Sequence, residues 1–85
     1  MWFVYIIKCA DETLYTGITT DIQRRLSEHN SSEKWAKYTK MRRPVEMVFS
    51  QVCDDRSQAS KLEYKIKKYT KQQKLTIIAT KKLPN

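Results

Sequence analysis

Apolar and polar residues alternate along this chain in blocks that predict six regular elements. Short stretches rich in β-branched and aromatic residues predict strands at 2–9, 13–18 and 45–53. Stretches with helical spacing predict helices at about 21–30 and from about residue 55 onward, with a last short helix after it. The order ββαβαα is typical of an α/β (α+β) fold in which helices flank a small three-stranded, mostly antiparallel sheet.

The first two strands are predicted to form a hairpin whose register depends on the length of its loop. The strand at 2–9 is apolar on both faces, which is typical of a central strand. If residues 10–12 form the loop, Tyr5 lies opposite Gly17. Tyr5 and Tyr15 are then diagonal neighbours on one face, with Cβ atoms roughly 7–8 Å apart. A loop longer by one residue would place the two rings on opposite faces.

Gly17 is the only glycine in the chain, and it lies just before the first predicted helix. We therefore expect the backbone there to bend or to approach another group closely. Thr20 and Gln23 have the spacing of a capping box, which predicts where this helix begins. Arg25 and His29 are four residues apart and share one face of the helix. Together with the tyrosine pair, they indicate a candidate site.

The third strand and the last helix have less regular patterns. Strict alternation along the third strand places one group of apolar residues on one face and a second group on the other. The first group is Val45, Met47 and Phe49, and the second is Val48 and Val52. Thr70 and Gln73 predict the start of a helix at 71–80, although residues 76–78 alone would also suit a strand.

The second helix carries an apolar stripe and one carboxylate beside it. Asp55 and Gln58 have capping-box spacing, and the stripe consists of Ala59, Leu62, Ile66 and Tyr69. Glu63 lies at the margin of the stripe. It has two interpretations: an ion pair with Lys67 one turn later, or a metal ligand that leans toward the core.

The charge composition of the chain indicates which class of partner it binds. Lysine and arginine number 17 against 9 aspartate and glutamate, which gives a formal charge of +8. This excess favours nucleic acid as a partner, before an acidic membrane. No apolar run approaches the roughly 20 residues of a membrane span, and no signal peptide is evident, so we expect a cytoplasmic protein without a membrane partner. Cys9 and Cys53 are expected as buried thiols, with a disulfide as the alternative.

The chain is expected to form one domain over residues 1–85, with a core at about 2–70, a C-terminal helix and a tail at 81–85. A connecting segment at 33–44 interleaves cations with aromatic rings. Cations neutralise phosphates and rings stack on bases, so this segment is a candidate nucleic-acid surface. Its two aromatic residues would equally well fold back onto the core. The candidates are Lys34, Trp35, Lys37, Tyr38, Lys40, Arg42 and Arg43.

Taken together, these residues resemble the GIY-YIG nuclease superfamily, and most closely its small single-domain bacterial members. The two signature triplets match Phe3-Val4-Tyr5 and Tyr15-Thr16-Gly17. The helix arginine, the position often held by His or Tyr, and the metal-binding glutamate of the family match Arg25, His29 and Glu63. The chain departs from the pattern at Phe3, where the family has glycine, and it has no asparagine between Glu63 and Lys82.

The resemblance implies hydrolysis of phosphodiester bonds with a single Mg²⁺ (or Mn²⁺) that binds weakly without substrate. Glu63 would hold the ion, because Mg²⁺ keeps several waters and needs few protein ligands. Arg25 would stabilise charge that develops on the phosphate. Tyr5 and Tyr15 would position or deprotonate the attacking water, and His29 would assist this proton transfer.

Two further hypotheses belong to other classes. The first is a nucleic-acid-binding domain that kept the fold and has weak or no catalytic activity. The second is a subunit that depends on a protein partner for its specificity. Among nucleic acids, we expect DNA before RNA.

Overall fold

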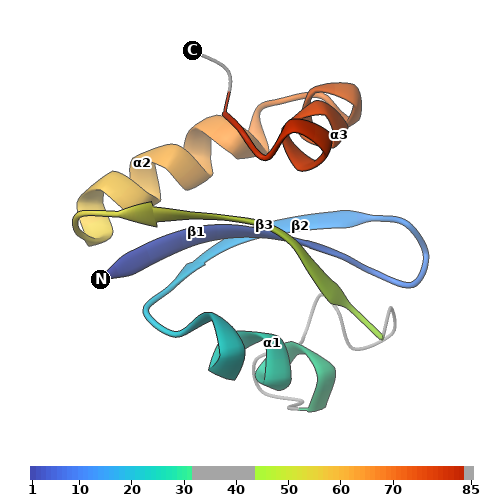
Figure 1. Cartoon of the computed structure of the whole chain (residues 1–85), viewed down its shortest axis with the longest axis horizontal. Coiled ribbons are helices and arrows are strands. Elements are labelled where there is room, and N and C mark those ends of the chain that lie inside the picture. The colour runs from blue at the N-terminus through green and yellow to red at the C-terminus, as the bar shows by residue number, and fades with distance from the viewer. Residues whose placement is uncertain (32–43, 84–85) are drawn as a thin grey trace.

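A three-stranded antiparallel sheet forms the middle layer of the molecule, with strand order β2-β1-β3. The computed structural model of the chain describes residues 1–31 and 44–83. Its elements occur in the order ββαβαα (Figure 1). They are β1 (Trp2–Lys8), β2 (Leu14–Thr19), α1 (Ile22–Ser31), β3 (Glu46–Cys53), α2 (Arg56–Lys67) and α3 (Lys71–Thr80). The predicted fold class and element order are confirmed.

Helices cover both faces of this sheet, with α2 and α3 on one face and α1 on the other (Figure 1). Side chains of β1 alternate between two cores. Val4 and Ile6 join the core under α2 and α3, whereas Tyr5, Ile7 and the following Cys9 join the core over α1. Because β1 is central and both its faces are covered, it is apolar on both sides. The predicted stripe of α2 also packs into the first core, through Ala59, Leu62, Ile66 and Tyr69.

The β1–β2 hairpin has the predicted register, with Tyr5 opposite Gly17 and Ile7 opposite Tyr15. Its loop is closed by a 2.9 Å hydrogen bond from the Cys9 amide to the Thr13 carbonyl. Glu12, the last loop residue, has a φ of 71°, a left-handed conformation that such loops often require. The three-residue loop is what sets the faces of the two tyrosines.

The prediction for the faces of β3 is wrong, because the strand contains a bulge. Ile6 pairs with Phe49 and Ile7 pairs with Met47, so Val48 is skipped. A bulge inserts one extra residue into the strand, and the alternation reverses beyond it. Met47 therefore packs in the core over α1, whereas Phe49 packs in the core under α2 and α3.

The helices begin at caps that the sequence predicted only in part. For α1 the cap is Asp21 rather than Thr20, since the Asp21 carboxylate accepts a 3.0 Å hydrogen bond from the Arg24 amide. In α2, Asp55 accepts from the Gln58 amide, but the Gln58 side chain accepts from Asp54 instead of the cap. Thr70 and Gln73 form the full predicted capping box of α3, so 76–78 are helical.

Three further expectations concern the thiols, the membrane and the connecting segment. Cys9 and Cys53 are buried free thiols. Within the described ranges, no helix has the length and apolar character needed to cross a membrane. The seven candidate nucleic-acid-binding residues between 34 and 43 lie outside the described residues.

Candidate active site

The site is built around the ring of Tyr5, which lies on the central strand and is 1% exposed. Its ring passes directly over Gly17 on the neighbouring strand. A Cβ atom at Gly17 would lie 2.5 Å from the Tyr5 hydroxyl oxygen and 2.7 Å from the adjacent ring carbon. Gly17 does not have a positive φ. Of the two reasons expected for this glycine, the structure therefore supports close approach.

Three aromatic rings meet on the face of the sheet that α1 covers. Tyr5 and Tyr15 have ring centroids 6.5 Å apart, as their shared face predicts. His29, near the end of α1, is 2% exposed and lies edge-on to both rings, with centroids 6.0 Å from Tyr5 and 5.3 Å from Tyr15. Its Nε2 atom lies 3.0 Å from the Tyr5 hydroxyl oxygen, in a buried hydrogen bond.

Charged groups of both signs act on the Tyr5 hydroxyl. Burial raises the pKa of Tyr5 well above its usual value near 10, and Tyr15, Glu63 and Glu28 raise it further. Arg25 acts in the opposite direction and lowers this pKa. The hydroxyl therefore stays protonated at neutral pH, and a free phenolate is unfavourable at this position.

Arg25 lies on α1, one turn before His29, with its side chain 22% exposed. Its Nε atom is 3.9 Å from a carboxylate oxygen of Glu28, three residues along the same helix. Sequence reasoning missed Glu28, although its spacing of three residues from Arg25 was visible. This carboxylate lies beside the guanidinium and, like it, contributes to the field at Tyr5.

Glu63 lies on α2, in the other helical layer, and its side chain is 23% exposed. Its carboxylate is 3.4 Å from the Lys67 ammonium, so the ion-pair interpretation of Glu63 describes this structure. An i,i+4 pair of this kind contributes only about 0.3–0.5 kcal/mol and leaves the carboxylate available for other ligands. Its charge raises the pKa of Tyr5, which places Glu63 within electrostatic reach of the rings.

The acidic side chains decide which kind of metal ion this site could bind. Among residues 1–31 and 44–83, no three His, Cys, Asp or Glu side chains come together as a ready-made metal site. A single, partly exposed carboxylate fits an Mg²⁺ ion that is held mainly by water and substrate oxygens. The donor set at Glu63 is thus chemically suited to one weakly bound hard cation.

The fold and these residues define a GIY-YIG domain. Residues 1–76 match the family described as the GIY-YIG catalytic domain, and the chain belongs to this family.

The chain also has relatives among proteins named UPF0213. The chain is similar to a UPF0213 protein of Desulfotalea psychrophila, with 60% identity over 91% of this chain and 70% of that protein. It is 54% identical to a UPF0213 protein of Staphylococcus epidermidis, over 89% of this chain and 92% of the relative.

Two solution NMR structures have the same fold. The protein EF2693 from E. faecalis matches with a TM-score of 0.62 and 42% identity, over 92% of this chain and 82% of that one. The UPF0213 protein BH0048 from Bacillus halodurans matches with a TM-score of 0.61 and 36% identity, over 95% and 86% of the two chains.

Proposed function

We propose that this protein is a metal-dependent endonuclease that hydrolyses phosphodiester bonds in nucleic acid, with DNA as the expected substrate. One observation carries the proposal. The Tyr5 hydroxyl is hydrogen-bonded to His29, borders Tyr15, and experiences the opposite charges of Arg25 and Glu63. All of these residues lie within the span 1–76 that matches the GIY-YIG catalytic domain. They are also the positions at which the sequence resembles the motifs of that family.

The Tyr5–His29 pair supplies a route for the proton of the attacking water. Because its pKa is raised, Tyr5 keeps its proton at neutral pH and cannot act as a base by itself. Because its oxygen lies 3.0 Å from His29 Nε2, Tyr5 can pass its own proton to the imidazole as it accepts one from water. No phenolate then accumulates. Tyr15, which is only half-buried, contacts both rings and orients the water beside them.

Arg25 and the cation that Glu63 would hold stabilise the negative charge that develops on the scissile phosphate. The guanidinium is partly buried, so its interaction with the developing charge is weakly screened and contributes about 3–4 kcal/mol. When bound at Glu63, Mg²⁺ or Mn²⁺ would act as a Lewis acid on the phosphate oxygens. Lys67 would release the carboxylate at little cost, since an exposed pair is weak.

The test is a cleavage assay on supercoiled plasmid, branched DNA and single-stranded RNA, each with Mg²⁺, Mn²⁺ or EDTA. We expect nicking that depends on the metal and on Glu63 and Arg25. Removal of Arg25 (Arg25→Ala) should lower the rate by about 10² to 10³. Glu63→Gln should abolish metal-dependent turnover and leave nucleic-acid binding largely intact.

The chain offers a matched control for each variant. Glu46 on β3 is another glutamate with a lysine partner, at 3.6 Å, but it is not among the charges that shift the pKa of Tyr5, so Glu46→Gln should cut normally. Arg24 is the exposed neighbour of Arg25 on α1, and Arg24→Ala should retain most of the rate. Equal losses in the controls and the site variants would refute the assigned roles.

A second candidate function is nucleic-acid binding without cleavage, which the formal charge of +8 favours. A binding domain would shift the same substrates in a salt-sensitive manner and would be indifferent to Glu63→Gln. Binding without nicking under every metal condition would decide for this alternative.

A further inference from the structure

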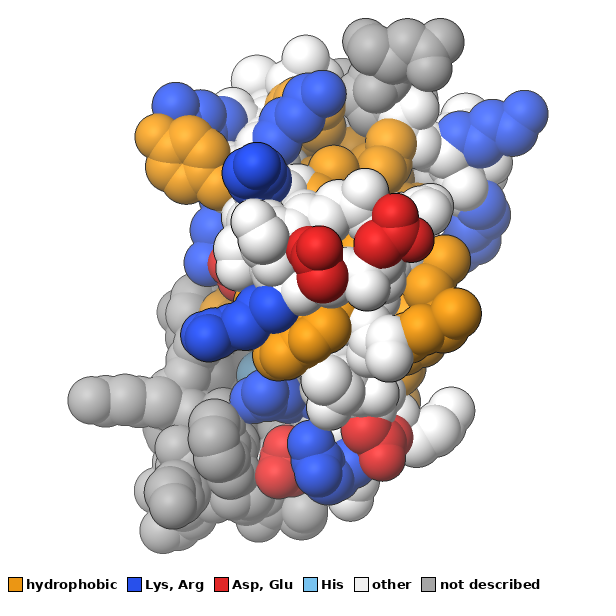
Figure 2. All heavy atoms as spheres, turned by 90° about the vertical axis from the view of Figure 1, so that its left-hand side faces the viewer, with side chains coloured by type: hydrophobic (Ala, Val, Ile, Leu, Met, Phe, Trp, Pro, Cys, Tyr) orange, Lys and Arg blue, Asp and Glu red, His pale blue; other side chains and the backbone are white. Residues whose placement is uncertain are grey.

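The excess positive charge of the chain is concentrated in one layer of the fold. Between Arg56 and Leu83 the sequence has nine lysine or arginine residues and one acidic residue, Glu63, whereas the rest of the chain carries eight of each sign. This region forms α2 and α3, which cover one face of the sheet. Figure 2 shows Lys and Arg side chains over the upper part of one side of the molecule, where these helices lie.

Three lysines of this layer form a row along α2, the last of them at the C-cap of the helix. Lys61, Lys65 and Lys68 are separated by four and three residues, so they lie along one side of the helix over about 10 Å. All three are exposed. The Lys68 ammonium lies 4.3 Å from the ring centroid of Tyr64, an aromatic side chain that is itself 64% exposed. We call these three residues the α2 lysine row.

The row differs from Lys67, another cation of α2, in that no acidic group of the described residues pairs with it. Arg56 lies over the Trp2 ring at 5.8 Å, and Lys67 pairs with Glu63 at 3.4 Å. Among the described residues, no carboxylate pairs with any member of the row. Like charges at adjacent turns of a helix repel one another by a few tenths of a kcal/mol each. An anionic ligand along the row would relieve this repulsion.

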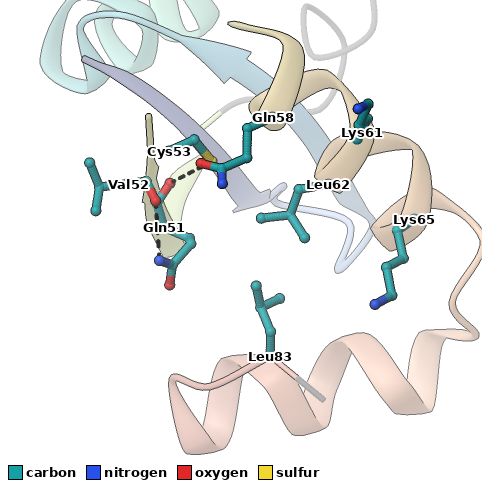
Figure 3. A pocket seen from close by; sticks show the side chains of 8 residues that line it. All are labelled: Gln51, Val52, Cys53, Gln58, Lys61, Leu62, Lys65 and Leu83. Carbon is teal, nitrogen blue, oxygen red and sulfur yellow. Dashed lines mark hydrogen bonds between the residues drawn. The ribbon is translucent and has the colours of Figure 1, made fainter. Parts of the chain in front are cut away.

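A groove of about 350 Å³ borders the row between α2, β3 and the C-terminal segment. Figure 3 shows Leu62 and Leu83 pointing toward each other across it, with Lys65 beside them and Lys61 farther along α2. A phosphate would not bind against the apolar leucines. It would bind to the lysines at the rim of the groove, so a polyanion would lie along the row and not in the groove.

We infer that the α2 lysine row binds the phosphate backbone of the nucleic acid whose scissile bond lies at the candidate active site. By helical geometry the row lies on the opposite side of α2 from Glu63, about one helix diameter or 10 Å away. A strand that leaves Glu63 therefore crosses the outer surface of α2, past Tyr64, to reach the row. This inference rests on the proposed function for its ligand, and it assigns the surface that holds the substrate beyond the reacting phosphate.

An acidic membrane is the competing polyanion for a lysine-rich surface. Helices that lie in a membrane interface place large apolar side chains opposite their basic face. In α2 the apolar side, with Ala59 and Ile66, is buried in the core and is not available to lipid. The surface thus offers charge without an insertable apolar face, which favours nucleic acid.

The experiment compares two triple variants that remove the same charge. One is Lys61→Gln/Lys65→Gln/Lys68→Gln. The control is Lys71→Gln/Lys74→Gln/Lys82→Gln, from α3 and the segment after it. Affinity for a labelled DNA oligonucleotide is measured in EDTA, so that nothing is cut, from about 50 to about 200 mM salt. Plasmid nicking with Mn²⁺ is measured in parallel over a range of DNA concentrations.

Loss of three phosphate contacts should reduce the slope of log affinity against log salt by about 2–3 and weaken binding more than tenfold at low salt. The control should change the slope by less than about 1. Lys61→Arg/Lys65→Arg/Lys68→Arg should restore the slope, because arginine also binds phosphate. In the nicking assay, the row variant should need a higher DNA concentration for half-maximal nicking than the wild type and the control, because the row holds the substrate and does not touch the reacting atoms.

Equal losses of DNA affinity in the two glutamine variants would overturn the inference. An unchanged slope of log affinity against log salt in the row variant would do the same. The inference would also fall if the row variant lost binding to phosphatidylglycerol vesicles and kept its affinity for DNA. If the wild type nicks DNA but the row variant and the control have the same salt slope, this inference fails and the proposed nuclease function stands. If the row controls binding and no metal yields nicking, the proposed nuclease function fails and the surface assignment stands.

Discussion

Replacement of Gly17 by alanine tests the central packing contact of the candidate site. The new Cβ would lie 2.5 Å from the Tyr5 hydroxyl oxygen, 2.7 Å from its Cζ and 3.1 Å from its Cε2. Real Cβ atoms do not approach other atoms this closely, so the ring must move. Tyr5 is 1% exposed and is held by its hydrogen bond to His29, so it cannot move without disturbing the core or breaking that bond.

The magnitude follows from three contributions. Overpacking of a core costs about 1–3 kcal/mol. Loss of the Tyr5–His29 hydrogen bond adds about 1 kcal/mol. Because the φ of Gly17 is not positive, alanine suits the backbone and gains about 0.5–1 kcal/mol from reduced chain entropy. We expect Gly17→Ala to lower the free energy of unfolding by about 2 kcal/mol, the opposite sign to that of a strand glycine without the contact.

The assay is urea unfolding followed by circular dichroism, with Tyr5→Leu as the second arm of a double-mutant cycle. Leucine removes the ring, so Gly17→Ala should be neutral or slightly stabilising in that background. The coupling between the two sites should therefore be about 2 kcal/mol. A neutral or stabilising effect of Gly17→Ala in the wild type would refute the steric argument. So would a cost of Gly17→Ala that persists unchanged in the Tyr5→Leu background.

Three further predictions concern stability. Thr16 is 3% exposed and its hydroxyl has no hydrogen-bond partner among the described residues, so Thr16→Val should stabilise the protein by about 1 kcal/mol in urea unfolding. Glu12 has a φ of 71°, so Glu12→Gly should stabilise by about 0.5 kcal/mol or more after loss of its weak 3.5 Å pair with Lys8. The raised pKa of Tyr5 means that above pH 10 the unfolded state loses a proton that the folded state keeps. Stability should therefore fall as pH rises beyond 10, by up to about 1.4 kcal/mol per pH unit, and less steeply in Tyr5→Phe.

Each of these has a clear contrary result. Destabilisation by Thr16→Val would mean that the hydroxyl is satisfied in solution. A loss of stability in Glu12→Gly would show that the loop does not hold residue 12 in the left-handed region. Parallel pH profiles for the wild type and Tyr5→Phe would show that the Tyr5 hydroxyl titrates alike in the folded and unfolded states.

The sequence by itself determined the elements of this protein and the local geometry of its hairpin. Strand and helix periodicity placed the six elements of the described residues in order, because each pattern reflects neighbours within a few residues. A three-residue loop was enough to place Tyr5 and Tyr15 on one face, since hairpin register is a short-range property. The single glycine marked the site, but two physical reasons for it remained open.

Only the tertiary structure decided between those reasons, because the group that requires Gly17 lies on another strand. The contact of His29 with both tyrosine rings and the electrostatic reach of Glu63 to Tyr5 likewise depend on how α1 and α2 pack against the sheet. The bulge at Val48, which moved Phe49 to the opposite core, has no signal in a strand that is apolar on both faces. Periodicity reports which residues are buried, whereas long-range packing decides which of them meet.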